Sequence, residues 1–212
     1  MEKKPEWLKV RYNQDAVNEV AALMRDLKLN TVCKEANCPN LGECYQKHTS
    51  TFMILGSICT RNCRFCNVTT GHPLPPDPEE LNHNVETVRE LQGAVRPQAR
   101  YERSLGVLRY CKEQDPTLLT KTGFMVGLGE TEEQISRLMD DILETGCDIL
   151  TIGQYLQPSP QHYPLARYAT PEDFARWKEL ALAKGFRHVA SAPLARSSYK
   201  AWEALEDVHD LY

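Results

Sequence analysis

Hydrophobic residues recur with two different spacings along this chain, and the two spacings alternate. Short apolar runs closed by glycine or polar residues are typical of buried strands, and they occur at 51–55, 118–126, 148–152 and 187–191. Helix-spaced apolar stripes separate the last three runs, and another fills 101–113. This order of strands and helices predicts an α/β fold with a parallel sheet and the helices outside it.

Two of the expected helices carry clear sequence signals. Thr131-Glu-Glu-Gln134 is a capping box, and Thr170 followed by Pro171 is an N-cap with proline at the first helical position. Gly146 and Gly185 are expected to end these helices. The residues expected to face the core are Ile135, Leu138, Met139, Ile142 and Leu143 in the first helix, and Phe174, Trp177 and Leu180 in the second.

A further amphipathic helix is expected at 15–28, with Asp15 as its N-cap. Its apolar positions are Ala16, Val17, Val20, Leu23, Met24 and Leu27. It leads into a cysteine-rich segment, in which Pro39 and Gly42 are expected to break regular structure and let the backbone wrap a compact ligand.

Length and charge exclude several functional classes. The 212 residues suit one domain, and the net charge of −4 comes from interspersed acidic and basic residues. No basic stripe indicates a nucleic-acid partner, and no apolar run approaches the roughly 20 residues of a membrane span. The opening residues carry acids and no apolar run, which argues against a signal peptide or presequence. A thiol-rich chain of this kind is expected in a reducing cytoplasm.

Six of the eight cysteines fall in one short segment, in two groups of three. The groups are Cys33, Cys38 and Cys44, and Cys59, Cys63 and Cys66. A structural zinc ion usually takes four protein ligands, whereas a cubane iron-sulfur cluster held by three cysteines leaves one iron open to another ligand. The two groups therefore predict two 4Fe-4S clusters, each with one distinctive iron.

Two other interpretations of the cysteines are less favoured. A disulfide framework is disfavoured because the chain has enough apolar residues to build a core without staples. Two zinc sites would need further ligands, for which His48 and His72 are nearest. Cys111 lies outside both groups and is expected to be a small buried hydrophobic residue rather than a ligand.

The spacing of Cys59, Cys63 and Cys66, with Phe65 before the last cysteine, resembles the signature of the radical S-adenosylmethionine enzymes. Three further stretches narrow the resemblance to lipoyl synthases, and two more also look like that family's sequence, so that the likeness runs from about residue 30 to 200. These are the C-x4-C-x5-C group, Cys63-Arg-Phe-Cys66-Asn-Val-Thr-Thr-Gly71 and Arg196-Ser-Ser-Tyr199, together with Met125–Thr131 and Ile152–Ser159.

The resemblance implies a radical sulfurtransferase that inserts two sulfur atoms into an octanoyl chain on a lysine. Cys59, Cys63 and Cys66 would hold the cluster that binds and cleaves S-adenosylmethionine. The other cluster would be consumed as the sulfur source, with Ser198, or secondarily Ser197, as its fourth ligand. Arg196 would neutralise cluster charge or orient its loop, the alternative being a surface salt bridge.

Partners also follow from the resemblance. The substrates would be octanoylated lipoyl carrier domains, namely those of 2-oxoacid dehydrogenase acyltransferase subunits and the glycine cleavage carrier protein. An electron donor such as ferredoxin or flavodoxin would be needed.

By the same resemblance, several polar and glycine residues would bind S-adenosylmethionine or the acyl chain. They are Asn82, Asn84, Glu86, Gly127, Gly129, Gln154 and Gln157. The amides of the turn at Gly127 and Gly129 are expected to be free to meet an anion or cofactor. A polar turn before a helix would also explain the first three residues, and ordinary loop polarity the two glutamines.

The likeness breaks after Glu80, which runs directly into Leu81. Relative to lipoyl synthases about 60 residues are absent, or about two strand-helix units. The fold is therefore expected to be a shortened, partial parallel (β/α) barrel at 51–191. Residues 1–50 would form an N-terminal extension with the first cysteine group, and 192–212 a C-terminal extension.

The absent part helps to hold S-adenosylmethionine in the family, so a second function stays open. It is a non-catalytic iron-sulfur protein, either a truncated homologue, a cluster carrier or a binder of lipoyl domains. A zinc-binding structural module is the third hypothesis.

Overall fold

The computed structural model describes residues 5–8, 13–26, 30–47, 50–51, 58–59, 63–71 and 83–196. The chain divides into two compact units. The first, the cysteine unit, comprises Met1–Glu79 and Pro158–His162, and the second, the sheet unit, comprises Glu80–Gln157 and Tyr163–Tyr212. This division differs from the three segments expected from the sequence, which remain a prediction.

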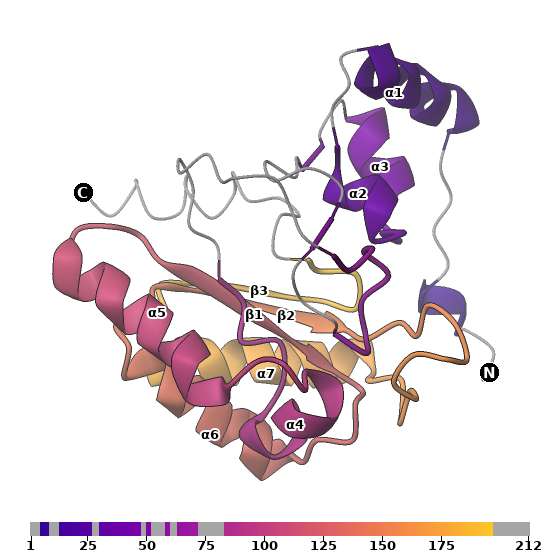
Figure 1. Ribbon diagram of the computed structural model, residues 1–212. Coiled ribbons are helices and arrows are strands. Elements are labelled where there is room, and N and C mark those ends of the chain that lie inside the picture. Colours follow the sequence, from indigo (N-terminus) through magenta and orange to yellow (C-terminus); the bar gives the residue numbers. More distant parts are fainter. Residues whose placement is uncertain are drawn as a thin grey trace. The chain divides into compact units, whose positions relative to one another are not determined.

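The sheet unit is built on a three-stranded parallel sheet in the order β1-β2-β3 (Figure 1). Its strands are β1 (Lys121–Val126), β2 (Ile149–Gln154) and β3 (His188–Ser191). Its helical elements are η2 (Arg89–Leu91), α4 (Gln92–Val95), α5 (Tyr101–Gln114), α6 (Glu132–Leu143) and α7 (Pro171–Lys184). In Figure 1 these helices lie on one side of the sheet. The predicted α/β class with a parallel sheet is therefore confirmed.

A short extended segment continues the parallel order beyond β1. Glu86 forms a single parallel bridge with Phe124, through a bond from Glu86 N to the Gly123 oxygen and one from Met125 N to the Glu86 oxygen, both 2.9 Å. The chain leading into the first helices of the unit thus passes along the edge of β1.

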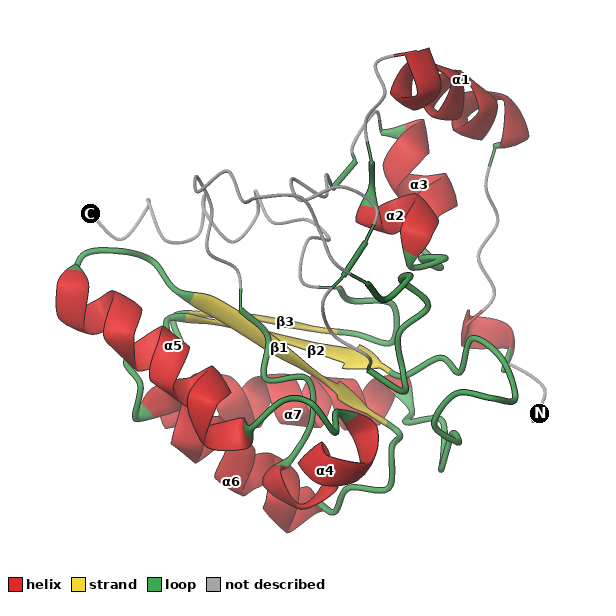
Figure 2. Cartoon of the chain, in the orientation of Figure 1, coloured by secondary structure: helices red, strands yellow, loops and turns green. Residues whose placement is uncertain are grey.

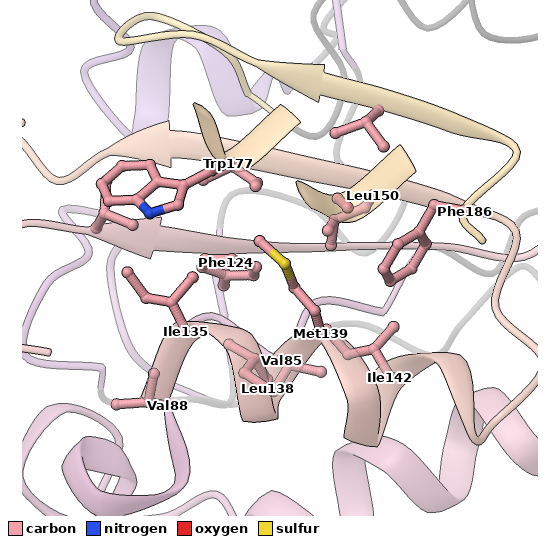
Figure 3. Packing of buried hydrophobic residues seen from close by; sticks show 14 of the residues in the cluster. Val85, Val88, Phe124, Ile135, Leu138, Met139, Ile142, Leu150, Trp177 and Phe186 are labelled. Carbon is pink, nitrogen blue, oxygen red and sulfur yellow. The ribbon is translucent and has the colours of Figure 1, made fainter. Parts of the chain in front are cut away.

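The two faces of the sheet differ in composition because successive side chains of a strand point to opposite faces. Phe124 and Ile152 point to the helical side, where apolar side chains from the sheet and helices interlock (Figure 3). The buried residues of this core include Ile135, Leu138, Met139, Ile142 and Trp177. The opposite face carries Gly123 paired with Thr151 and is poor in apolar bulk.

The predicted capping box at Thr131 is present, and the predicted N-cap Thr170 forms a second one. Thr131 Oγ1 accepts from Gln134 N at 3.3 Å while the Gln134 side chain accepts from Thr131 N, and Thr170 and Asp173 repeat the arrangement at α7. These side chains satisfy amides that the first helical turn leaves without partners.

Element boundaries shift where turns were read as strand. β1 begins at Lys121 rather than at 118, because Asp115 closes a turn by accepting from the backbone N–H groups of Thr117 and Leu118. β2 runs on to Gln154, two residues past its expected end. β3 begins at His188 instead of Arg187.

The named secondary-structure elements that the structure describes in the cysteine unit are helices, and loops connect them (Figure 2). Its elements are η1 (Glu6–Leu8), α1 (Gln14–Asp26), α2 (Val32–Glu35) and α3 (Leu41–Gln46). Val20 of α1 packs with Cys33 and Tyr45 in a small core of its own.

Two expectations for this unit change, and a third cannot be compared with the structure. Asn13, not Asp15, caps α1, since the Asn13 side chain accepts from Asp15 N at 2.9 Å. Gly42 lies inside α3 and does not break regular structure there. The strand expected at 51–55 falls, after Thr51, outside the described residues.

In the part of the chain that the structure describes, no helix combines the length and the apolar character needed to cross a membrane.

Candidate functional site

The first cysteine group is carried by two short helices and the turn between them. Cys33 lies in α2 and Cys44 in α3, and Cys38 follows Asn37, whose left-handed φ of 51° turns the chain. The Cys38 N–H donates to the Cys33 oxygen at 3.0 Å. Ser50 Oγ approaches Cys33 Sγ at 3.9 Å. The backbone thus folds back on itself between the three cysteines.

The pKa of Cys44 indicates that the three thiols lie close enough to influence one another. Burial raises the pKa of Cys44 to about 11, and the neighbouring thiols of Cys33 and Cys38 contribute to the rise, whereas Lys47 opposes it. Three thiolates in one place therefore repel one another, and a cationic centre would relieve that repulsion. Metal binding at such a group displaces the thiol protons.

The second cysteine group sits on a loop tied together by the backbone. Cys59 N donates to the Thr69 oxygen and Gly71 N donates to the Cys59 oxygen, both at 2.9 Å. Cys66 N closes a turn on the Cys63 oxygen at 3.1 Å. These bonds bring the two ends of the loop together, so the three cysteines stand on one short excursion of the chain.

The cysteines of both groups are available as thiol donors. None of the eight cysteines forms a disulfide, which disfavours the disulfide framework. Among the described residues no three Cys, His, Asp or Glu side chains stand close enough to share one metal ion. Three thiols are the donor set that a cubane cluster takes from a protein when its fourth iron binds another ligand.

In the sheet unit, Asn84 and Glu86 mark a polar site at the edge of β1. Glu86 has a φ of 74°, a left-handed conformation that is costly for a residue with a side chain and is typical of functional positions. The residue as a whole is half-buried, but its carboxyl group is buried. That burial raises the pKa of Glu86, while the charges of Arg96 and Arg196 and a hydrogen bond from Asn84 oppose the rise.

Arg96 holds this polar segment in place. Its Nη1 donates to the backbone oxygens of Val85 at 2.9 Å and Asn84 at 3.4 Å. Asn84 Oδ1, Arg96 Nε and Thr151 Oγ1 are buried with no hydrogen-bond partner among the described residues. Asn84 Oδ1 and Thr151 both flank the bare Cα of Gly123, where a side chain would contact them. Buried polar atoms without partners are uncommon, and a polar ligand beside the glycine would supply the hydrogen bonds that these atoms lack.

The glycine turn after β1 differs from the expectation. Its amides are not free, because Glu130 Oε1 accepts from Gly127 N at 2.6 Å and Oε2 from Leu128 N at 2.9 Å. The chain itself thus supplies the anion that a ligand was expected to bring. Gly127 and Gly129 have φ values of 96° and 107°. These left-handed conformations favour glycine, so they account for the residue type at both positions without any contact to a cofactor.

Gln154 also has its hydrogen bonds filled by the chain. It is completely buried, and its Nε2 donates to the oxygens of Val126, Tyr155 and Arg167 while its Oε1 accepts from Ala169 N. These contacts give Gln154 a structural role in anchoring the loop after β2. Its assignment to the ligand pocket, like that of the half-buried Gln157, remains a prediction.

The remaining predicted residues are placed unevenly. Arg196 lies close enough to Glu86 for its charge to oppose the rise in the pKa of that carboxyl group. Asn82, Ser197 and Ser198 lie outside the described residues, as do His48 and His72. Cys111 is half-buried on α5 instead of fully buried.

Three residues that were not predicted from the sequence take part in these sites. They are Arg96, Glu130 and His162, whose ring nitrogen Nε2 lies 3.3 Å from the Cys66 oxygen. Glu130 directly follows Gly129, so an acid beside a glycine turn was a usable signal. The contacts of Arg96 and His162 join segments far apart in the chain and leave no local pattern.

Comparison with curated proteins agrees with this arrangement. No family model matches the chain. The chain is 44% identical over 279 residues to the lipoyl synthase of Rubrobacter xylanophilus, with 96% of this chain and 87% of the relative covered. It is 42% identical over 272 residues to that of Caldanaerobacter subterraneus, covering 94% of this chain and 96% of the relative. The lipoyl synthase of Alkaliphilus metalliredigens is 40% identical over 281 residues, with 97% of each chain covered.

The chain belongs to the lipoyl synthase family. The predicted family is thereby confirmed, and with it the prediction of a radical S-adenosylmethionine sulfurtransferase. Lipoyl synthases use iron-sulfur clusters and S-adenosylmethionine, and thiols such as those of the two cysteine groups are the donors that such clusters need.

Proposed function

We propose that this lipoyl synthase carries two 4Fe-4S clusters, one on each cysteine group, and acts on octanoylated lipoyl carrier domains. The observation that carries the proposal is the presence of both complete cysteine groups, with no disulfide between them, in a chain of this family. When bound, the clusters and S-adenosylmethionine supply one-electron chemistry, the radical that removes hydrogen from carbon, and the sulfur that replaces it. Six thiols of this kind suit a reducing cytoplasm.

The three thiols of Cys33, Cys38 and Cys44 would hold the cluster that supplies sulfur. Burial and the neighbouring thiols raise the pKa of Cys44 to about 11 and so favour its protonated form in the absence of a cation. Ser198, with Ser197 as second choice, completes this set. A serine oxygen is a weaker partner for iron than a thiolate, which suits a cluster that has to be taken apart.

Cys59, Cys63 and Cys66 would hold the second cluster and leave one iron open for S-adenosylmethionine. In the sheet unit, the resemblance to the family assigns Asn84 and Glu86, an amide and a carboxylate at the edge of β1, to S-adenosylmethionine binding. Asn84 Oδ1 and Thr151 Oγ1 are buried without partners among the described residues, so a polar ligand would satisfy them. The hydrogens to be removed are not acidic, so the chain's own task is to orient the groups and to exclude water.

We place the shortening of the chain after Glu80. The alignment with the Rubrobacter relative spans 279 residues, whereas this chain has 212, and this difference in length supports the proposal. About two strand-helix units would account for that difference. The three parallel strands and the bridged segment at Glu86 then form part of a (β/α) barrel.

The same difference in length favours a second candidate function, that of an iron-sulfur protein without catalysis. The decisive experiment reconstitutes the chain with iron and sulfide without oxygen, then adds reductant, S-adenosylmethionine and an octanoyl-lysine peptide. About eight irons per chain, 5′-deoxyadenosine and a peptide carrying two sulfur atoms are expected. Two molecules of 5′-deoxyadenosine should form per lipoyl group, because two C–H bonds are broken.

Each other outcome has one meaning. Iron without either product would support the non-catalytic protein. Deoxyadenosine without sulfur insertion would locate the fault at the first cysteine group or its serine. Zinc in place of iron would overturn both candidates in favour of a structural zinc module.

A further inference from the structure

The loop that follows β2 reaches the second cysteine group through one histidine. Pro158–His162 belongs to the cysteine unit, although the residues on either side of it belong to the sheet unit. His162 Nε2 lies 3.3 Å from the backbone oxygen of Cys66, and its Nδ1 lies 2.8 Å from Ser159 Oγ. Both contacts are made by a half-buried side chain.

The chemistry of these partners fixes the role of Nε2. A backbone carbonyl only accepts hydrogen bonds, so Nε2 carries the hydrogen and donates it to Cys66. This holds for the neutral ring and for the charged ring alike. Ser159 Oγ, which also lies 2.7 Å from Gln161 Oε1, holds the opposite nitrogen of the ring.

The three cysteines of this group are anchored in different ways. Cys59 is held on both sides by backbone bonds to Thr69 and Gly71. Cys66 has the local turn to Cys63, and His162 adds an anchor 96 residues away in sequence. A bond to the Cys66 carbonyl restrains the peptide plane after Cys66 and hence the direction of its side chain. Contacts behind a ligand commonly set its orientation in this way.

We propose that His162 is a positioning residue for the cluster on Cys59, Cys63 and Cys66, acting through the carbonyl oxygen of Cys66. The inference rests on the proposed assignment of a cluster to these three cysteines. His162 is not a ligand and takes no part in the chemistry. Its loss should leave the thiolates able to bind iron, but with Cys66 less well oriented for the open iron to receive S-adenosylmethionine.

A set of variants separates the hydrogen bond from general damage to the loop. His162→Gln places an amide N–H near the position of Nε2, whereas His162→Asn reaches only to the position of Nδ1. His162→Ala removes both contacts. Ala166→Ser is the control, because Ala166 is an exposed residue on the same connection after β2.

The first measurement needs no cluster. Hydrogen exchange at the Cys66 amide, which donates to the Cys63 oxygen, should become about tenfold faster in the Asn and Ala variants of the full-length protein, because losing the hydrogen bond to the Cys66 carbonyl leaves that turn less restrained. The Gln variant and the control should exchange like the unchanged protein.

The second measurement uses the reconstituted protein. Iron content should stay the same in all variants, while the change in the electron paramagnetic resonance signal on adding S-adenosylmethionine should need about tenfold more ligand for Asn and Ala. Unchanged exchange and titration in the Asn variant would overturn the inference. A Gln variant that behaves like Ala would do so too. If the unchanged protein itself takes up no iron on these cysteines, the proposed function fails first.

Discussion

At the amino-terminal end of the parallel sheet, the buried carboxylate of Asp148 has strong hydrogen-bond and ion-pair partners. Farther along the sheet, the side-chain oxygens of Asn84 and Thr151 lack such partners among the described residues. Asp148 accepts from Thr120 N and Oγ1 and forms ion pairs with Lys112 at 2.6 Å and Arg187 at 3.3 Å. Asn84 Oδ1 and Thr151 Oγ1 are buried with no partner in the described part of the chain.

This contrast separates stability from function within one sheet. A satisfied network at one end holds strands together, while unpaired polar atoms and the left-handed Glu86 toward the other end are costs that folding alone does not explain. In parallel α/β folds the carboxyl ends of the strands carry the chemistry, and we expect the same division in the sheet unit.

Removing the carboxylate at the satisfied end should have the largest effect. Asp148→Ala leaves Lys112 and the Thr120 amide without their buried partner, so the free energy of unfolding should fall by about 3–5 kcal/mol. Chemical denaturation measures it. Asp140→Ala, which breaks the more exposed pair with Lys184, should cost less than about 1 kcal/mol. Equal losses in the two variants would contradict the special role of Asp148.

A glycine at the carboxyl end tests whether everything there is functional. In Gly127→Ala the new Cβ would lie 2.2 Å from Gln154 Nε2 and 2.5 Å from the Arg167 oxygen, at a φ of 96°. The free energy of unfolding should fall by about 2–4 kcal/mol. Gly93→Ala, with nothing within 4 Å, is the matched control and should be neutral or slightly stabilising. A tolerated alanine at 127 would mean that Gln154 is not held as described.

Glu86 should give the opposite balance of effects. Glu86→Gly relieves the left-handed backbone, worth about 1 kcal/mol. That gain offsets the loss of the hydrogen bond from Asn84, so the free energy of unfolding should change by no more than about 1 kcal/mol. Affinity for S-adenosylmethionine should fall about tenfold or more, as for the removal of a charged hydrogen bond. Equilibrium dialysis and denaturation test the two halves. A strong loss of stability would erase the contrast between the ends of the sheet.

The smallest effect concerns the pH dependence of stability at the start of α7, where the Asp173 carboxylate is paired with Thr170 N, Arg167 and Arg176. Partial burial acts to raise the pKa of Asp173, but bonds from Thr170 N, Arg167 and Arg176 outweigh it and lower the pKa to about 2. Because the folded value lies below the unfolded one, this contribution is present above about pH 4 and disappears as pH falls toward 2. Thermal unfolding against pH should show it. Asp173→Asn should flatten that part of the curve, and an unchanged curve would contradict the shift.

Local patterns predicted much of the sheet unit. The capping residues Thr131 and Thr170, and the apolar stripe of α6, form within a few residues of sequence and appear as expected. Errors arose where a turn and a strand look alike, as at 118–120, and where a glycine such as Gly42 sits inside a helix. In both cases contacts with other residues outweighed the local preference.

The candidate sites divide in the same way. Cysteine spacing predicted the two cluster groups, because ligands of one small cluster have to lie close along the chain. Together with the other motifs it predicted the family, which the relatives confirm. Only the tertiary structure decided that Glu130 fills the amides of the glycine turn, that Gln154 is buried by its own loop, and that His162 reaches Cys66. The last two contacts join residues from 13 to 96 positions apart, and such pairings depend on how the chain folds back, which no local pattern records.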